Sequence, residues 1–125
     1  MKEIVNSALA PAPIGPYSQA VRSGNTLYVS GQIPFDQSTN SMVDNSIESE
    51  TDQVMKNLGY ILKEAGLSFD DVVKCSIFVK DMGNFSRVNE VYGKYFPKNP
   101  PARETVEVSE LPKGVNVEIS CIASF

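Results

Sequence analysis

Two charged residues near the C-terminus, Arg103 and Glu118, are the side chains of this sequence best suited to chemistry. An arginine can bind a planar carboxylate through two parallel hydrogen bonds, and a glutamate can orient or deprotonate a water molecule. Together they would suit a small anionic substrate that reacts with water. Each also has a plainer interpretation: a surface arginine paired with an acid, and an exposed cross-strand glutamate.

The segments that carry these two residues are predicted to be β-strands. Residues 100–108 and 115–121 alternate apolar and polar side chains, and successive side chains of a strand point to opposite sides. In the first segment, Val106 falls on one side and Arg103 on the other. In the second segment, Glu118 falls on the side opposite to the apolar residues. If both apolar sides face one core, Arg103 and Glu118 project together from the side away from that core.

The chain contains no histidine, which excludes a Ser-His-Asp triad, a Cys-His pair, a two-histidine ribonuclease mechanism and the usual zinc sites. Cys75 and Cys121 have no metal-binding or disulfide spacing, and each occupies an apolar position of a predicted strand. We therefore expect two buried, unreactive thiols and no metal site. Proton transfer must come from carboxylates, tyrosine, lysine, the substrate or water.

Length and composition predict one globular domain spanning residues 1–125, with 42% hydrophobic and 21% charged residues. The net charge of −4 disfavours nucleic acid as a partner. No segment approaches the roughly 20 apolar residues of a membrane span, and the first residues lack the apolar run of a secretory signal. A cytoplasmic location is therefore expected, with no membrane contact.

Local signals predict the order β-β-β-α-β-α-β-β and an α+β domain with two helices on one face of a mixed sheet. A hairpin turn is expected at Gly24 and Asn25, and a helix end at Gly66. Residues 36–46 are predicted to be a polar loop. The expected strands cover about residues 2–6, 18–23, 26–31 and 72–80 besides the two C-terminal segments, and the expected helices cover 47–65 and 85–96.

The sheet face without helices is predicted to be partly apolar, which indicates burial against another subunit. The residues expected on that face are Tyr28, Ser30, Phe78, Thr105, Ser120 and Ile122.

Four further residues are candidates for a binding site. Asn89 lies beside the apolar stripe of the second helix, where a buried amide would need partners. Tyr17 follows a Gly-Pro turn, and Ser30 and Gly31 close a strand where a bulge or a ligand would approach the backbone. The plainer interpretations are a solvated helix flank, a tyrosine that plugs the sheet end, and a bulge without a ligand.

Several segments together resemble the reactive intermediate deaminase family, also called Rid or YjgF-type proteins, and most of all its RidA type. The similarity extends over essentially the whole chain, in order and without large insertions. The resembling segments are residues 12–20, 27–34, 79–82, 85–92, 101–103 and 111–119.

The resemblance implies a chorismate-mutase-like two-layer α+β fold with about six strands. It also implies a homotrimer whose three sheets form a central barrel, with ligand clefts between subunits. The implied activity is hydrolysis of reactive enamines and imines, such as 2-aminoacrylate and 2-aminocrotonate from pyridoxal-phosphate-dependent dehydratases, to 2-oxo acids and ammonia. Neither a cofactor nor a metal is implied for the deaminase itself.

By the same resemblance, Arg103 matches the arginine that binds the substrate carboxylate, and Glu118 matches the acid beside the attacking water. Pocket positions are matched by Tyr17, Ser30, Gly31, Asn89 and Thr105. Thr105 departs from the cysteine found in many RidA-type proteins, which excludes thiol-based regulation there. Two other functions stay open: a module that binds small carboxylates without turnover, and a ribonuclease, which the charge and the absent histidine disfavour.

Overall fold

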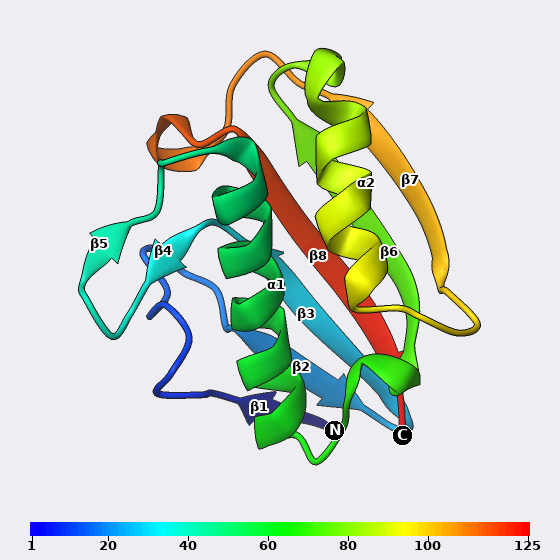
Figure 1. The fold of residues 1–125 in the computed structure, drawn as a ribbon. Helices are drawn as coiled ribbons and strands as arrows, with labels where there is room; N and C mark the ends of the chain where they lie inside the picture. Colours follow the sequence, from blue (N-terminus) through cyan, green and yellow to red (C-terminus); the bar gives the residue numbers. More distant parts are fainter.

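The computed structural model describes residues 1–125, which form a six-stranded mixed sheet and two long helices (Figure 1). The sheet order is β1-β2-β3-β8-β6-β7, and only β6 and β7 are parallel neighbours. The strands are β1 Lys2–Val5, β2 Ala20–Ser23, β3 Thr26–Gln32, β6 Val72–Val79, β7 Ala102–Glu107 and β8 Val117–Ser124, and the helices are α1 Ile47–Glu64 and α2 Phe85–Lys94.

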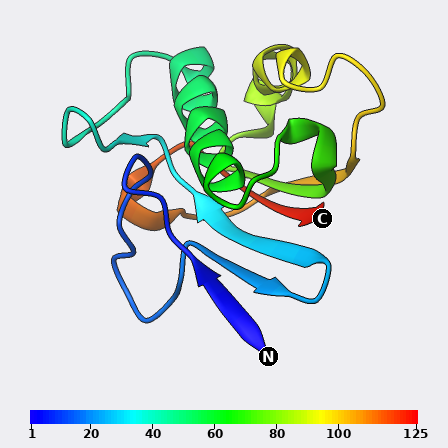
Figure 2. The same ribbon diagram turned by 90° about the horizontal axis from the view of Figure 1, so that it is seen from below.

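Both helices cover the same face of the sheet, and the opposite face carries no helix (Figure 2). The core lies between the helices and the covered face, where Leu58 of α1 and Ile119 of the central strand β8 are fully buried. This arrangement confirms the predicted α+β architecture with a mixed sheet and two helices. Neither helix is long and apolar enough to cross a membrane.

The ends of α1 follow the signals expected from the sequence. The Ser46 side chain accepts a hydrogen bond from the backbone N–H of Ser49 at 3.1 Å and caps the N-terminus. At the other end Gly66 adopts φ +80°, and the N–H groups of Gly66 and Leu67 donate to the carbonyls of Lys63 and Leu62. This is a Schellman motif, which glycine favours because it adopts positive φ without strain.

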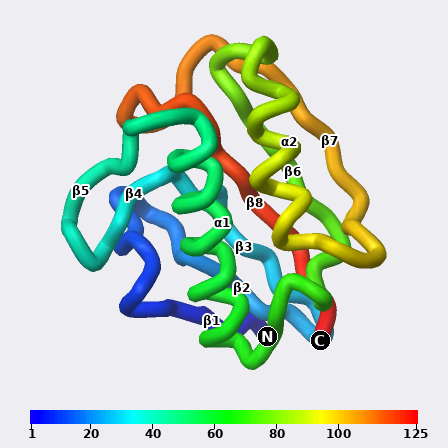
Figure 3. The backbone as a smooth tube through the Cα atoms, viewed as in Figure 1, coloured from blue at the N-terminus to red at the C-terminus, as the bar shows by residue number.

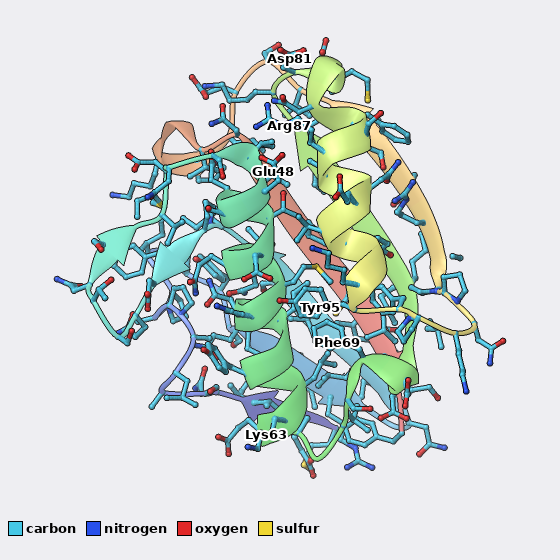
Figure 4. The ribbon with its side chains drawn as sticks, viewed as in Figure 1. Glu48, Lys63, Phe69, Asp81, Arg87 and Tyr95 are labelled. Atoms are coloured by element: carbon cyan, nitrogen blue, oxygen red, sulfur yellow. The ribbon has the colours of Figure 1, made fainter.

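Contacts hold α2 at both ends, to Glu48 of α1 and to Phe69 beyond the end of α1, as the labelled side chains of Figure 4 show. Arg87 donates two hydrogen bonds to the Glu48 carboxylate, at 2.9 and 2.7 Å. Near the other end the Phe69 and Tyr95 rings lie 5.0 Å apart between their centroids. These contacts hold α2 over β6 and β7. The helix stops at Lys94, two residues before its predicted end, because the last backbone bonds tighten to a three-residue spacing.

The predicted hairpin joins β2 and β3 at Gly24 and Asn25. Ser23 pairs with Thr26, so the turn has two residues, and only Gly24 adopts a positive φ of 60°. A glycine at the first turn position is typical of a type II′ hairpin, whose twist matches that of the strands.

The segment predicted as a polar loop contains a second, short hairpin, so that prediction was incomplete. The strands β4 Phe35–Asp36 and β5 Ser41–Met42 pair and project from the side of the domain, as the backbone tube in Figure 3 shows. The buried amide of Asn57 on α1 donates to the carbonyls of Ile33 and Phe35, at 3.0 and 2.9 Å. This polar anchor fixes the start of the hairpin against α1.

The helix-free face of the sheet is partly apolar, as predicted. Tyr28 is 50% exposed and Val106 is 43% exposed, while Phe78 and Ile122 are half-buried beside them. Thr105 was expected on this face, but it pairs with the buried Ile77 and faces the helices. Val106, the next residue, pairs with Phe78 and lies on the open face instead.

Candidate active site

Strand β6 lies between the two strands that carry Arg103 and Glu118. Cys75 of β6 pairs with Arg103 on one side and with Cys121 on the other, so these three side chains share the helix-covered face. Three residues further along β6, Phe78 pairs with Glu118 and Val106, which share the open face. Paired residues of neighbouring strands point to the same side of a sheet.

Arg103 and Glu118 therefore lie on opposite faces of the sheet, and the expectation that they share one side was wrong. Alternation in a strand defines two sides, but it does not say which side is covered. In β7 the valine faces the open side and the arginine lies beneath α2, which reverses the assumed orientation. Within one chain the two side chains do not form a single site.

Glu118 forms one wall of a pocket of about 330 Å³ on the open side. Four of the residues predicted for the site meet here, since Tyr17, Ser30 and Gly31 line the same pocket. The remaining lining residues are Ile14, Ile33 and Pro112. None of these three was predicted as a site residue, although all three lie within the segments that carry the family resemblance.

Gly31 allows Glu118 to lie directly over the backbone of β3. The pairing of β3 with β8 is interrupted by a bulge between Val29 and Gln32, as the isolated glycine suggested. A Cβ atom on Gly31 would lie 2.8 Å from both Cδ and Oε2 of Glu118. Only a glycine leaves room for the carboxylate in this position, so Gly31 shapes the pocket through its missing side chain.

Burial raises the pKa of the Glu118 carboxyl above its ordinary value. No positive charge or hydrogen-bond donor of the chain opposes this effect. The carboxyl is thus a free acceptor, or a donor when protonated, at the edge of this pocket. A carboxyl of this kind can take a proton from water near neutral pH more readily than an ordinary surface glutamate.

Tyr17 and Ser30 hold the rim of this pocket in place. The Tyr17 hydroxyl accepts a hydrogen bond from the backbone N–H of Ile14 at 3.3 Å. The Ser30 hydroxyl donates to the carbonyl of Ser18 at 2.6 Å, and its backbone N–H donates to the carbonyl of Gln19. Both hydroxyls therefore stabilise the loop that precedes β2.

A buried amide that the sequence analysis left without a role organises this loop. The Gln19 side chain accepts from the N–H of Ser7 at 2.7 Å and donates to the carbonyls of Ser7 and Pro11 at 3.1 and 3.0 Å. It thereby fixes the proline-rich segment that carries Ile14 and Tyr17. Beside the Glu118 pocket, the same segment helps to line an adjoining cavity of about 420 Å³.

Another polar contact anchors the start of the strand that carries Glu118. The buried Glu50 of α1 accepts hydrogen bonds from the backbone and side-chain nitrogens of Asn116, at 3.1 and 2.8 Å. Asn116 immediately precedes β8. Glu50 therefore helps to set the position of Glu118 two residues later.

The second group of predicted residues lies on the covered face, around the half-buried Arg103. Its Nη1 atom donates a hydrogen bond to Oδ1 of Asn89 on α2 at 2.6 Å. The guanidinium carbon lies 5.5 Å from the centre of the Phe85 ring and 5.2 Å from that of Tyr92. No acidic side chain pairs with Arg103, because the ion pairs of the chain involve other residues.

Thr105 is two residues beyond Arg103 on the same face of β7. Its hydroxyl is buried and has no hydrogen-bond partner, so the side chain acts as a space-filling group under α2. The cysteines behave as predicted for buried thiols: burial raises the pKa of Cys75 and of Cys121. Neither thiol is activated as a nucleophile.

The structure thus sorts the predicted site residues into two groups. Tyr17, Ser30, Gly31 and Glu118 meet at one pocket on the open side, while Asn89, Arg103 and Thr105 meet under α2. The first group offers a carboxyl in a small cavity, and the second offers an unpaired guanidinium. No set of three or more histidine, cysteine, aspartate or glutamate side chains is arranged to hold a metal ion.

The chain is similar to known proteins along nearly its whole length. The family model described as Endoribonuclease L-PSP matches residues 7–125. The chain is 54% identical, over 98% of both sequences, to a RutC family protein of Saccharolobus solfataricus. It is 44% identical to the 2-iminobutanoate/2-iminopropanoate deaminase of Homo sapiens, over 98% of this chain and 90% of the human protein.

A solved structure extends the similarity to three dimensions. The protein YyfA of Yersinia pestis, described as a protein of unknown function of the conserved Rid family, superposes with a TM-score of 0.97, with 47% identity and all of both chains covered. Family model, relatives and structure agree along nearly the whole length of the chain. The protein therefore belongs to the Rid family of YjgF-type proteins.

Proposed function

We propose that the protein is an imine deaminase that hydrolyses 2-iminobutanoate and 2-iminopropanoate, with their enamine tautomers 2-aminocrotonate and 2-aminoacrylate. The products are the corresponding 2-oxo acids and ammonia. The observation that carries the proposal is Glu118, a carboxyl with a raised pKa and no partner in a small pocket. The name of the human relative supports the same activity.

The reaction needs no covalent intermediate with the protein. The enamine tautomerises to the imine, whose protonated form is a strong electrophile. Glu118 orients a water molecule and accepts its proton as the oxygen adds to the C=N carbon. The resulting carbinolamine expels ammonia once its nitrogen is protonated, and the C=O bond of the 2-oxo acid forms.

Arg103 binds the substrate carboxylate in this proposal. Its guanidinium has five N–H donors, and Asn89 occupies only one of them. Two of the remaining donors suffice for a paired contact with a carboxylate. The absence of an acid beside Arg103 supports this role, because the substrate does not have to displace a competing anion.

The site would be completed by a second copy of the chain, since Arg103 and Glu118 of one copy face opposite sides of the sheet. We propose a homotrimer in which each cleft takes Arg103 from one subunit and Glu118 from its neighbour. The three open sheet faces would pack together as a central barrel, which would cover Tyr28 and Val106. We also propose that the whole chain forms a single domain. A cytoplasmic location stays a prediction.

Mixing two inactive variants tests this proposal directly. Arg103→Ala and Glu118→Gln are each expected to lose imine hydrolysis, the latter by about 10²–10⁴-fold. After unfolding and refolding together in equal amounts, half the subunits retain Arg103 and the other half retain Glu118. Random trimers should then recover about a quarter of the wild-type activity, because only clefts with both residues work.

The assay couples threonine dehydratase and threonine to the protein and follows 2-oxobutanoate, with semicarbazide to trap unhydrolysed imine. Each variant refolded alone is the control. Recovery in the mixture supports both residues and the shared cleft. No recovery, from variants that refold and assemble, would refute the shared cleft, and full activity of either variant alone would remove that residue from the mechanism.

A carboxylate-binding module is the alternative that one observation favours. Arg103 and Asn89 form an anion site by themselves, without any contribution from Glu118. Such a module would bind 2-oxobutanoate and would not accelerate imine hydrolysis. Calorimetric binding without turnover in the wild-type protein would establish it. A ribonuclease is disfavoured because the chain has no histidine and a net charge of −4.

A further inference from the structure

The three arginines of the chain have different electrostatic surroundings. Arg87 is neutralised by the Glu48 carboxylate, to which it donates two hydrogen bonds. Arg103 has no acidic partner, and its hydrogen bond goes to the neutral amide oxygen of Asn89. A half-buried guanidinium without an acid needs some other group to hold it, because its hydration is incomplete.

Three residues of α2 surround this guanidinium. Phe85, Asn89 and Tyr92 are spaced by four and three residues, so they lie on one face of the helix. The two rings lie 5.5 and 5.2 Å from the guanidinium carbon, within the roughly 6 Å at which a cation interacts with an aromatic ring. The Asn89 amide oxygen accepts the hydrogen bond of 2.6 Å from the same guanidinium.

We infer that Phe85 and Tyr92 are positioning residues for substrate binding: their rings hold the Arg103 guanidinium in one orientation and leave its charge free. The inference rests on the proposed function, in which Arg103 binds the carboxylate. An acid in the place of the rings would hold the arginine as well, but it would neutralise the charge and compete with the substrate. The electron-rich ring faces attract the cation without occupying its N–H donors.

We call Phe85, Asn89 and Tyr92 together the arginine cradle. Such a cradle lowers the entropic cost of substrate binding. Arginine has many rotamers in solution, and ordering them when the substrate arrives would weaken the affinity. When the free protein already holds the side chain against the two rings, the entropy of ordering it is lost during folding and not during binding. The N–H donors that Asn89 does not use then face the incoming carboxylate in a fixed geometry.

The aromatic ring of Tyr92, rather than its hydroxyl, is the active part of this arrangement. Tyr92 is only 5% exposed, and its hydroxyl is buried without a hydrogen-bond partner. Tyr92→Phe should therefore leave the cradle intact. Phe85 is 36% exposed, so Phe85→Leu removes the ring, keeps an apolar side chain and leaves the core undisturbed.

The chain contains a matched control for Phe85→Leu. Phe125 is also 36% exposed, and its ring centre lies 3.7 Å from the guanidinium carbon of Arg22. Phe125→Leu removes an aromatic ring of equal exposure from another arginine. That pair lies beside the turn between β2 and β3, where no predicted site residue is found.

Two measurements test the inference. The first is ¹⁵N relaxation of the arginine Nε–H groups in the free protein, which reports side-chain order. The second is calorimetric affinity for 2-oxobutanoate. Phe85→Leu should make Arg103 more mobile and weaken binding about three- to tenfold, the usual effect of one cation–ring contact. Phe85→Tyr, Tyr92→Phe and Phe125→Leu should resemble the wild type in both measurements.

The outcomes separate this inference from the proposed function. If Arg103 is as mobile in the wild type as in Phe85→Leu, the cradle does not exist, whatever the protein binds. If order falls but affinity for 2-oxobutanoate is unchanged, the rings do not position the arginine for a substrate, and the inference is overturned. A wild-type protein with an ordered Arg103 and no affinity for 2-oxobutanoate would refute the proposed function and keep the cradle as a structural fact.

Discussion

Replacing Gly31 by alanine is a sensitive test of the Glu118 pocket, because the two residues are in direct contact. The new Cβ atom would lie 2.8 Å from Cδ and Oε2 of Glu118 and 3.0 Å from its Cγ. Ordinary contact begins near 3.4 Å, so the carboxylate must move by about 0.6 Å or more. The end of a flexible side chain moves more easily than the paired backbone of β3 and β8.

The substitution should therefore change activity far more than stability. Gly31 does not adopt a positive φ, so alanine fits its backbone conformation. The loss of chain entropy in the unfolded state would stabilise the variant by about 0.4–1 kcal/mol, and the crowding of Glu118 would offset this gain. A misplacement of about 1 Å at a reacting group can lower a rate about a hundredfold. We expect a tenfold to hundredfold loss of imine hydrolysis.

The measurements are 2-oxobutanoate formation in the coupled assay and thermal unfolding of the same samples. Gly93→Ala in α2 is the control, since a Cβ atom there meets nothing within 4 Å. It should raise the free energy of unfolding by about 1 kcal/mol and leave activity unchanged. In a Glu118→Gln background, Gly31→Ala should cost little additional activity, because both changes act on the same group.

Two results would refute this reasoning. Wild-type activity in Gly31→Ala would mean that the position of the carboxylate is unimportant for hydrolysis. Equal losses from Gly31→Ala in the wild-type and Glu118→Gln backgrounds would mean that the glycine acts on something other than Glu118.

Three further predictions follow from buried groups. Thr105→Val should raise the free energy of unfolding by about 1 kcal/mol in urea titrations, because it removes a buried hydroxyl without a partner. A lower free energy of unfolding would show that the hydroxyl has a hydrogen-bond partner. Because its folded pKa is raised, Glu118 should stabilise the chain fully below its ordinary pKa of 4.5 and lose this contribution as the pH rises through the folded value. Glu118→Gln should lack that fall, and an unchanged pH–stability curve would contradict the assignment. Cys75 and Cys121 should resist a thiol reagent in the folded protein and react in urea, since burial raises the pKa of both.

The division of the site has a consequence for assembly. A chain that carried Arg103 and Glu118 on one face could work as a monomer. This chain separates them by the thickness of its sheet, so the proposed reaction depends on contact between copies. If the proposed trimer forms through the open face, variants that weaken its packing, such as Val106→Lys, should lose activity in proportion to the loss of assembly.

Features set by a few neighbouring residues could be predicted from the sequence alone. Ser46 and Gly66 mark the ends of α1 because capping depends on side chains and backbone angles within one helical turn. Gly24 marks the hairpin for a similar reason, and Gly31 marks the bulge. The apolar open face, with Tyr28 on it, was also predictable because strand alternation is local.

Only the tertiary structure could decide which side of the C-terminal strands faces the helices. Alternation shows that Arg103 and Val106 point to opposite sides of β7, but both sides of this sheet bear apolar residues. The covered side is chosen by the insertion of β6 between β7 and β8 and by the packing of α2 over β7. These contacts join residues distant in sequence, so no local pattern carries their register, and the separation of Arg103 from Glu118 appears only when the sheet is assembled.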